Sequence, residues 1–296
     1  MGVNMTFSQE VKNEILKGSL TARHCQLARL SAFYTSMSFI EEGRLVFVCE
    51  EYLSAHIKGL LQKIYDMDDI KIIRDKSKTK IPVENKENDI IMSLKNEPGS
   101  LLPVSNLLIK NSCCKKAYLQ GMFLCCGSLT NPDKGYHLEF VNSSEEVLLQ
   151  ISSILEDFQI VSRLTKRKGN YVLYIKEGQM IVDFLNVIGA YKSLLNMENS
   201  IIMKDFRNNI NRKVNCETAN ILKSANAGSR QRADILYIKE NYGLEKIPEG
   251  LREVAILRLE YPDISLKELG EMMDPPLGKS GVNHRLRKIS ELRDSL

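Results

Sequence analysis

Two unusually apolar helical segments with small residues at matching places are the feature that most constrains how this chain can fold. One lies at 116–127 and the other at 30–38, and in each a leucine is followed two positions later by a small residue, with another small residue at the end. The matching positions pair Leu30 with Leu119, Ala32 with Gly121, and Ser38 with Gly127. A helix that is apolar nearly all round must be buried on several sides, so we expect these two to pack against each other.

The sequence after each segment predicts the same series of elements. A strand is expected after a short turn, then a helix, two further strands and a closing helix. The expected positions are 44–50, 52–65, 70–74, 89–94 and 100–110 in the first copy, and 136–141, 144–158, 160–166, 171–175 and 179–188 in the second. Ser143 and Glu146 have the spacing of a capping box before the second-copy helix. The pattern therefore predicts an α+β fold with the order αββαββα twice, the alternative being two unrelated buried helices.

The segment Leu119 to Gly127 resembles the LAGLIDADG signature of homing endonucleases, on which it can be laid without gaps, its leucine and both glycines matching. The first copy matches less well, through Leu30, Ala32 and Ser38. In that family the two motif helices pack through their small residues at a pseudo-two-fold axis, and eight strands form a saddle over duplex DNA. Small residues suit such a crossing because they let two helix backbones approach closely.

The endonucleases carry an acidic residue just before the last residue of each motif, because phosphodiester cleavage needs carboxylates that hold a divalent metal. Here those places are taken by Met37 and Cys126. Neither side chain suits Mg²⁺, a hard ion that prefers oxygen ligands. We therefore expect no catalytic residues and no enzyme activity. The alternative is a nuclease that uses carboxylates placed elsewhere, namely Glu41, Glu42 or Asp133.

The sequence changes character after Gly250 and predicts three short helices. The first spans 251–259 and is stopped by Pro262, the second opens with a capping box at Ser265 and Glu268, and the third begins near Ser280 after a Pro-Pro-containing turn. A short helix, a constrained turn and a basic helix are what a reader of the DNA major groove needs. The candidate DNA-binding residues are Ser265, Lys267, Lys279, Ser280, Gly281, Asn283, His284, Arg285, Arg287 and Lys288. A solvated, salt-bridged helix would show similar charges.

A second basic segment lies at 204–232, where seven basic residues stand against two acidic ones with asparagines between them. Its side chains are candidates for secondary phosphate contacts. They are Arg207, Asn208, Asn211, Arg212, Lys213, Arg230 and Arg232. The formal net charge of +4 is a weak indication of nucleic-acid binding by itself, so the distribution of charge carries the argument.

Taken along its whole length, the chain resembles the WhiA family of Gram-positive bacteria, which joins a degenerate LAGLIDADG domain to a C-terminal helix-turn-helix. The most specific likeness is in the tail, at 265–272 and 275–286, with further likeness at 5–12, 134–139 and 207–212. The resemblance implies a DNA-binding role in cell division, chromosome segregation or, in sporulating relatives, developmental transcription. We expect a LAGLIDADG-like domain at 1–203, in half-repeats of about 1–110 and 111–203. A basic connector at 204–232 and a helix-turn-helix domain at 233–296 are expected to follow.

Other classes of site and partner find little support in the sequence. The seven cysteines include no C-x-x-C pair and the four histidines are scattered, so neither a metal site nor a cofactor is expected. No apolar run approaches the roughly 20 residues of a membrane span and no signal peptide is visible, which predicts a cytoplasmic, nucleoid-associated protein. Double-stranded DNA is the expected partner. The alternative is a scaffold whose first domain binds a protein, such as a transcription factor or division component.

Overall fold

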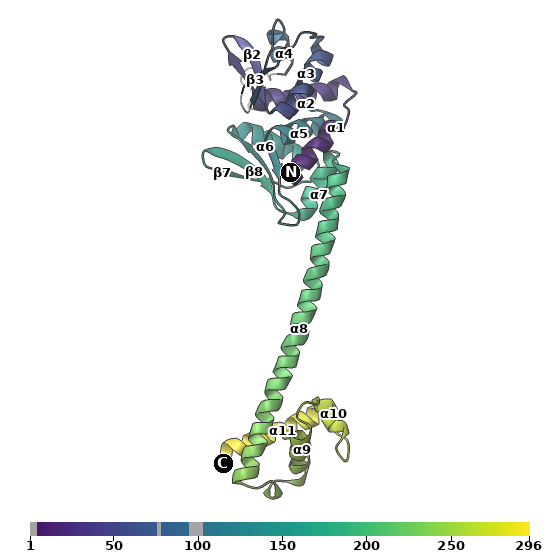
Figure 1. Ribbon diagram of the computed structural model, residues 1–296, viewed down its shortest axis with the longest axis vertical. Coiled ribbons are helices and arrows are strands. Elements are labelled where there is room, and N and C mark those ends of the chain that lie inside the picture. Colours follow the sequence, from purple (N-terminus) through teal and green to yellow (C-terminus); the bar gives the residue numbers. More distant parts are fainter. Residues whose placement is uncertain (1–4, 76–77, 95–102) are drawn as a thin grey trace. The chain divides into compact units, whose positions relative to one another are not determined.

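The computed structural model describes residues 5–75, 78–94 and 103–296 (Figure 1). It divides into two compact units, the first ending at Lys204 and the second comprising Asp205–Leu296. Among the helices in these described ranges, none combines the length and apolar character that crossing a membrane requires.

The first unit begins with one helix and then repeats the order αββαββα. After α1 (Phe7–Lys17), the first repeat contains α2 (Arg23–Met37), β1 (Ser38–Glu41), β2 (Arg44–Cys49), α3 (Glu51–Tyr65), β3 (Ile73–Asp75), β4 (Lys78–Pro82) and α4 (Glu87–Leu94). The second contains α5 (Ser112–Cys126), β5 (Gly127–Leu129), β6 (Leu138–Asn142), α6 (Glu145–Glu156), β7 (Arg163–Arg167), β8 (Asn170–Ile175) and α7 (Gly178–Val187). Each repeat forms its own antiparallel four-stranded sheet, in the orders β1-β2-β4-β3 and β5-β6-β8-β7. The predicted α+β class and duplicated order are therefore confirmed.

Two predicted elements of this unit were wrong, the strand at 89–94 and the closing helix at 100–110. Residues 89–94 form helix α4 and not a strand, because Ile90 and Leu94 are both buried at a spacing of four residues. The missing strand is β4, where buried Thr79 and Ile81 alternate with more exposed neighbours. A closing helix at 100–110 is absent from the described residues 103–110, and its first residues lie outside the described ranges.

Two smaller corrections concern element ends. The helix that follows β6 is capped by Ser144, whose hydroxyl accepts from the backbone N–H of Val147, and not by Ser143. The strand expected at 70–74 is the shorter β3, which pairs only with β4. Two short strands, β1 and β5, continue directly from the ends of the motif helices α2 and α5.

The motif helices α2 and α5 pack against each other in the middle of the first unit (Figure 1). Gly121 makes this possible, since a Cβ there would lie 2.6 Å from the Cβ of Ala32 and 3.0 Å from the carbonyl oxygen of Arg29. Leu30 and Leu119 are fully buried beside this contact, and Ser38 and Gly127 end the two motifs. The small residues of the motif therefore lie at the point of closest approach between the two repeats.

A single helix, α8 (Tyr191–Asn241), contributes residues to both units and was not predicted. Its first turn is anchored in the first unit by Glu14, whose carboxylate accepts hydrogen bonds from the backbone N–H groups of Lys192 and Ser193 at 2.7 and 3.1 Å. A carboxylate at a helix N-terminus satisfies unpaired donors and stabilises the helix dipole. The residues expected to connect the domains, 204–232, are helical and belong to α8.

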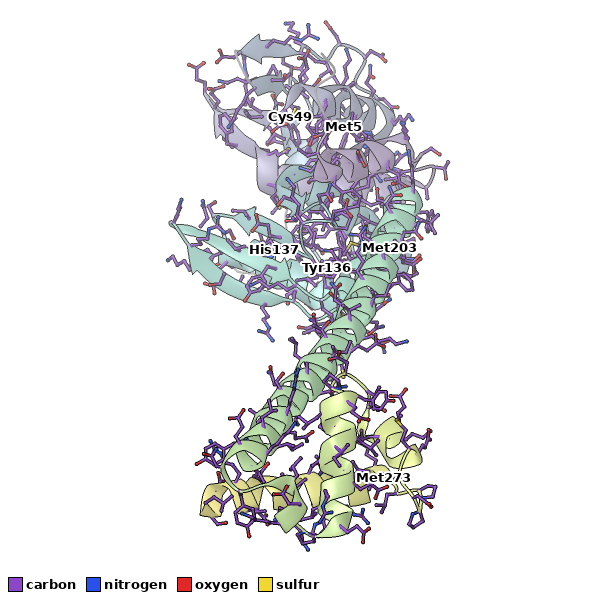
Figure 2. All side chains as sticks on the ribbon, turned by 60° about the horizontal axis from the view of Figure 1, so that its bottom comes forward. Met5, Cys49, Tyr136, His137, Met203 and Met273 are labelled. Carbon is purple, nitrogen blue, oxygen red and sulfur yellow. The ribbon has the colours of Figure 1, made fainter. Side chains whose placement is uncertain are left out.

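The second unit is a small helical domain. The C-terminal end of α8 is followed by the 3₁₀ turn η1 (Leu244–Lys246), α9 (Glu249–Glu260), α10 (Leu266–Glu271) and α11 (Lys279–Ser295). Ile235 and Ile238 of α8 pack with apolar residues of the three later helices, so α8 supplies part of this core. Figure 2 shows Met273 within these C-terminal helices, where its side chain is buried.

Candidate nucleic-acid interface

Helix α10 is held by a capping box at its start and by a close backbone contact at its end. The hydroxyl of Ser265 accepts from the N–H of Glu268, and the carboxylate of Glu268 accepts from the N–H of Ser265 at 2.8 Å. At the other end of α10, the N–H of Leu277 donates to the carbonyl of Gly270 at 2.8 Å. A Cβ on residue 270 would lie 1.9 Å from the carbonyl oxygen of Leu277, so only glycine fits. These contacts fix how α10 leads into α11.

Helix α11 has one buried face and one exposed basic face. Val282, Leu286 and Ile289 are buried in the domain core at a spacing of three and four residues. The opposite side is exposed and carries Ser280, Asn283, His284 and Arg287, flanked by Lys279 and Lys288. The geometry thus gives a helix with a row of exposed polar side chains opposite its core face, beginning at its first turn.

Arg285 differs from the other basic residues of α11 because it is committed to contacts inside the domain. Its guanidinium donates to the carbonyl of Gly250 at 2.9 Å and lies 3.8 Å from the carboxylate of Glu253. Arg252 and Arg258 are used in the same way, each donating to backbone carbonyl groups of neighbouring turns. These three arginines stabilise the loops of the domain. This role was not predicted from the sequence for any of them.

Two of the other candidate residues form exposed ion pairs within their own helices. Lys267 lies 3.7 Å from Glu271, and Arg287 lies 2.9 Å from Glu291. Exposed pairs of this kind contribute about 0.3–0.5 kcal/mol, so a phosphate can displace them at little cost. Ser265 is used as the N-cap of α10, and Gly281 lies against the side chain of Leu277.

The seven secondary candidates are all exposed on α8. They do not share one face, because their spacings distribute them around the helix. Arg212 and Arg230 are about five turns apart and lie on the same side. Another side of this part of α8 carries exposed apolar side chains, namely Phe206, Ile210, Val214 and Ile221. This part of α8 therefore exposes apolar side chains among its basic and polar ones.

A further basic surface lies on β7 and the hairpin turn after it, which the sequence analysis did not include. Arg163, Lys166, Arg167 and Lys168 are exposed there, and Lys166 lies over the ring of Tyr171 at 5.0 Å. The corresponding strand of the first repeat, β3, carries Arg74 next to Asp75 instead. The strongly basic composition of 163–168 was a signal available in the sequence.

The last turns of the motif helices offer no oxygen ligands at the places where the endonucleases carry acids. Met37 and Cys126 are half-buried there, and the thiol of Cys126 donates to the carbonyl of Met122 at 3.3 Å. Burial raises the pKa of the Cys126 thiol to about 12, which keeps it protonated at neutral pH. The chemistry of this end of the helix pair is apolar and thiol-based.

The three alternative carboxylates lie in two places, with Glu41 and Glu42 adjacent at the end of β1. Glu41 of β1 forms an ion pair at 2.8 Å with Lys80 of β4, the strand beyond β2 in the same sheet. Glu42 occupies a tight turn with a positive φ of 51°. Asp133 lies in the loop between β5 and β6, where it accepts a hydrogen bond from the Ser200 hydroxyl at 3.2 Å. Two of the three are thus already used in contacts within the first unit.

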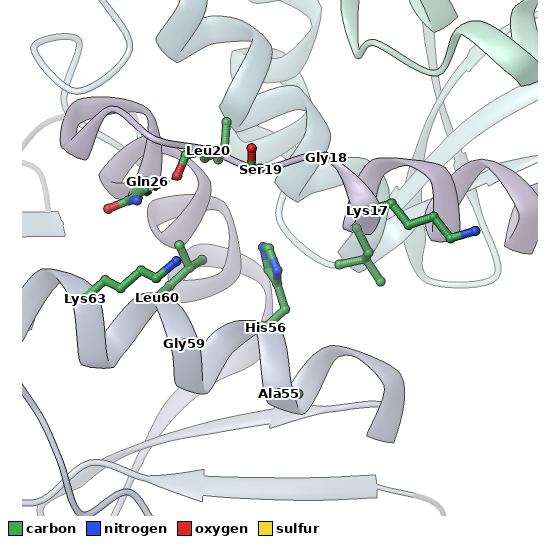
Figure 3. A pocket seen from close by; sticks show the side chains of 11 residues that line it. Lys17, Gly18, Ser19, Leu20, Gln26, Ala55, His56, Gly59, Leu60 and Lys63 are labelled. Atoms are coloured by element: carbon green, nitrogen blue, oxygen red, sulfur yellow. Dashed lines mark hydrogen bonds between the residues drawn. The ribbon is translucent and has the colours of Figure 1, made fainter.

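A hollow of about 330 Å³ lies in the first unit beside α3 (Figure 3). It is lined by His56 and Lys63 of α3, by Gln26 of α2 and by the segment from Lys17 to Leu20. The Gln26 amide donates to the carbonyl of Leu20 at 2.7 Å, which ties this segment to α2. Its lining has no pair of groups arranged for acid–base or nucleophilic chemistry, so we place the candidate interface in the second unit.

Comparisons with known proteins agree with this architecture. Residues 115–207 match the model of the WhiA LAGLIDADG-like domain, and residues 210–293 match that of the WhiA C-terminal HTH domain. Two relatives described as "Probable cell division protein WhiA", from Clostridium botulinum and Lachnoclostridium phytofermentans, are each 41% identical over 99% of both chains. The crystal structure of full-length DUF199/WhiA from Thermatoga maritima has a TM-score of 0.61 and 29% identity, covering 98% of this chain and 99% of that one.

The family models name the two parts that the sequence analysis expected, and the relatives extend the likeness over almost the entire length. The first half-repeat lies outside the matched residues 115–207, and it is joined to the family by the full-length relatives and by its own αββαββα order. This chain therefore belongs to the WhiA family, with a LAGLIDADG-like domain followed by a helix-turn-helix domain.

Proposed function

We propose that this protein is a DNA-binding regulator that acts in cell division and chromosome segregation on the nucleoid. In this proposal α11 enters the major groove and reads base edges through Asn283, His284 and Arg287. Lys279, Ser280 and Lys288 bind the flanking phosphates, as does Lys267 of α10. The relatives' description as cell division proteins and the helix-turn-helix family model support this assignment.

The observation that carries the proposal is the division of α11 into a core face and an exposed basic face. Side chains near the N-terminal half of a recognition helix reach base edges first, and asparagine and arginine form paired hydrogen bonds with adenine and guanine. The rigid contact between Gly270 and Leu277 presents this helix in a fixed orientation. Arg285 is excluded from the reading set because its guanidinium is held by Gly250.

The test measures duplex binding by fluorescence anisotropy at several salt concentrations, first with a random-sequence duplex and then with duplexes selected from such a pool. Replacing Arg287 and Lys288 with alanine should weaken binding at least tenfold and lower the slope of log K against log salt by about one for each lost phosphate contact. Asn283→Ala should reduce the preference for the selected sequence with little change in binding to random duplex.

A matched control replaces two exposed lysines of the same domain, Lys239 and Lys246, with alanine, which removes the same charge away from α11. This control should retain at least half of the binding affinity. Equal losses in the two double variants would contradict recognition by α11 and favour non-specific attraction to a basic domain.

We propose in addition that nuclease activity has been lost. Met37 and Cys126 hold the places at which the endonucleases carry their metal-binding acids, and neither provides an oxygen ligand. Supercoiled plasmid incubated with the protein and Mg²⁺ or Mn²⁺ should stay intact. Nicking that disappears when Glu41, Glu42 and Asp133 are replaced by their amides would show that the enzyme alternative is right.

The scaffold alternative is favoured by one observation on the first repeat. Phe39, Ile40 and Ile73 are exposed on β1 and β3, the two edge strands of its sheet. Exposed apolar side chains on an edge strand are a common feature of protein-binding surfaces. A photo-crosslinker at position 40 should then capture a division or transcription protein in cells, whereas one at Lys168 on the other sheet should not. Equal labelling at both positions would remove support for this alternative.

A further inference from the structure

The first turns of the two motif helices bring four metal-ligating side chains together. His24 and Cys25 lie at the start of α2, and Cys113 and Cys114 lie at the same places in α5. Their ligand atoms, one imidazole nitrogen and three sulfurs, are all within 4.8 Å of one another. The Nδ1 of His24 lies 3.1 Å from the sulfur of Cys114, 3.3 Å from that of Cys25 and 3.9 Å from that of Cys113.

We propose that this group of four is a structural zinc site, in which His24, Cys25, Cys113 and Cys114 bind one Zn²⁺ and tie the two half-repeats together. Three thiolates and one imidazole are a tetrahedral ligand set that favours zinc over hard ions such as Mg²⁺. A Zn–S distance of about 2.3 Å places tetrahedral sulfurs about 3.8 Å apart, so the observed separations need only small side-chain rotations to close around an ion. With all four positions filled by protein, the site would be structural and closed to substrate.

The internal repeat explains how two pairs of adjacent residues can share one ion. The alignment that pairs Leu30 with Leu119 also pairs His24 with Cys113 and Cys25 with Cys114. Each repeat therefore contributes the same two helix positions, and the pseudo-two-fold packing of α2 against α5 makes these positions face each other. Ligands that come from two helices give the ion a cross-linking role that a C-x-x-C pair on one loop could not have.

Metal binding would change the protonation state of the three thiols. Burial, with hydrogen bonding to Cys113 and the charges of Cys113 and Cys114, raises the pKa of the Cys25 thiol to about 12. The pKa of Cys114 is raised as well, first by burial. Zn²⁺ would displace three thiol protons to solvent and leave a complex with a net charge of −1.

The surroundings suit a complex of that charge. Cys25 and Cys114 lie in a small apolar cluster with Ala28 and Ala117, while His24 and Cys113 are exposed and leave a path by which an ion can enter. In α2 and α5 the described first turns carry no acidic residue and their N-caps make no side-chain hydrogen bond. The unpaired N–H groups of both helices would then stabilise the thiolates.

The experiment titrates the full chain, purified under reducing conditions and stripped of metal, with Zn²⁺ and with Co²⁺ as a spectroscopic probe. One equivalent should bind, and bound Co²⁺ should give the intense visible bands and the near-ultraviolet sulfur-to-cobalt band of a tetrahedral thiolate site. His24→Cys should keep binding and shift these bands, as a fourth sulfur replaces nitrogen. Because the first Co²⁺ spectrum is recorded on the unchanged protein, that part of the test does not depend on the folding of a variant.

Cys25→Ser and Cys114→Ser should lower zinc affinity at least about a hundredfold, since even partners outside the ligand set change affinity 10- to 100-fold. The control is Cys216→Ser, because Cys216 is exposed on α8 and should leave affinity unchanged. The proposal would be overturned if the unchanged chain bound zinc no more tightly than the double variant C25S/C114S does. Free thiols can be alkylated at the moment of cell lysis. The proposal would also be overturned if Cys25 and Cys114 were then found joined by a disulfide.

Discussion

The two ends of the motif helix pair α2 and α5 differ in the metal ligands that they bring together. The first turns bring together the soft ligands of His24, Cys25 and the two adjacent cysteines of α5. The last turns carry Met37 and Cys126, which offer no hard oxygen ligand where the endonucleases hold their metal. In this chain the side chains that could bind metal therefore lie at the first turns of the two helices. The last turns, at the other end, are those that would face a scissile phosphate. A soft ion at the first turns would stabilise the scaffold without supplying hydrolytic chemistry.

Between these ends lies a buried polar path that joins the two repeats. Arg29 of α2 is almost fully buried, and its guanidinium donates to Nε2 of His56 at 3.2 Å and to the side-chain oxygen of Gln120. Gln120 in turn donates to the carbonyl of Ile188 at 2.8 Å. Burial lowers the pKa of Arg29 to about 10, which still leaves it charged at neutral pH. The middle of the helix pair thus depends on hydrogen bonds to one desolvated cation.

The largest expected effect is the difference between Zn²⁺ and Mg²⁺ in how much they stabilise the protein. Adding Zn²⁺ at a thousand times its dissociation constant should stabilise the metal-free protein by about 4 kcal/mol, whereas Mg²⁺ at millimolar concentration should not change its stability. Such a gain corresponds to an increase of about 10 °C in the melting temperature of the first unit. Differential scanning calorimetry of the full chain measures both effects. Stabilisation by Mg²⁺ but not by Zn²⁺ would reverse the comparison.

The next effect concerns the crossing point of the two helices. Gly121→Val should lower the free energy of unfolding by about 3 kcal/mol, because its Cβ would lie 2.6 Å from the Cβ of Ala32 and cannot move away from the backbone of Arg29. Urea denaturation followed by circular dichroism gives the value. Gly59→Ala on α3 is the control, since its Cβ meets nothing within 4 Å, and it should stabilise the helix by up to about 1 kcal/mol. Similar results for the two variants would mean that α2 and α5 are not in tight contact.

The third effect is the pH dependence of the buried polar path. Burial, with the positive charges of Arg29 and Lys63, lowers the pKa of His56 from 6.5 to about 4 in the folded protein. Because the folded value is the lower one, the unfolded chain takes up the proton first as the pH falls. The contribution of neutral His56 is complete above about pH 6.5 and is lost progressively down to about pH 4. Between pH 7.5 and pH 5 this loss amounts to about 2 kcal/mol.

His56→Gln isolates this contribution, because glutamine keeps an acceptor for Arg29 and does not titrate. Urea denaturation at pH 7.5 and pH 5 should show a fall in stability that is smaller in the variant by about 2 kcal/mol. The same fall in both proteins would assign the acid sensitivity to other groups and leave His56 with no special role in joining the repeats.

The duplicated order of the first unit could be predicted because its signals are local. Buried helices with small residues, and strands bounded by turns, can be read from short stretches of sequence. Residues 89–94 were misassigned because Ile90 and Ile91 give a short apolar run that fits a strand or a helix equally well. Only the burial of both Ile90 and Leu94 distinguishes the two.

The site residues show the same limit at longer range. The basic face of α11 follows from helical periodicity, and so the exposed candidates could be found in the sequence. The role of Arg285 could not, because its partner Gly250 is brought to it only by the packing of α9 against α11. The group at His24 and Cys114 was missed for a related reason. Its ligands are adjacent pairs that converge from two repeats, and metal-site patterns are sought within one local segment.

The smallest effect tests a carboxylate on the strand that follows the last turn of α2. Glu41 follows α2 on β1 and forms an ion pair with Lys80 at 2.8 Å, and both side chains are partly exposed. Glu41→Gln should leave the free energy of unfolding almost unchanged, because exposed ion pairs are weak and screened by salt. The pair raises the pKa of Lys80, so the variant should bring that pKa back toward its ordinary value, which NMR of the lysine side chains can measure. A large loss of stability, or a loss that appears only when Mg²⁺ is present, would instead show that Glu41 has a metal-binding role at this end of the helices.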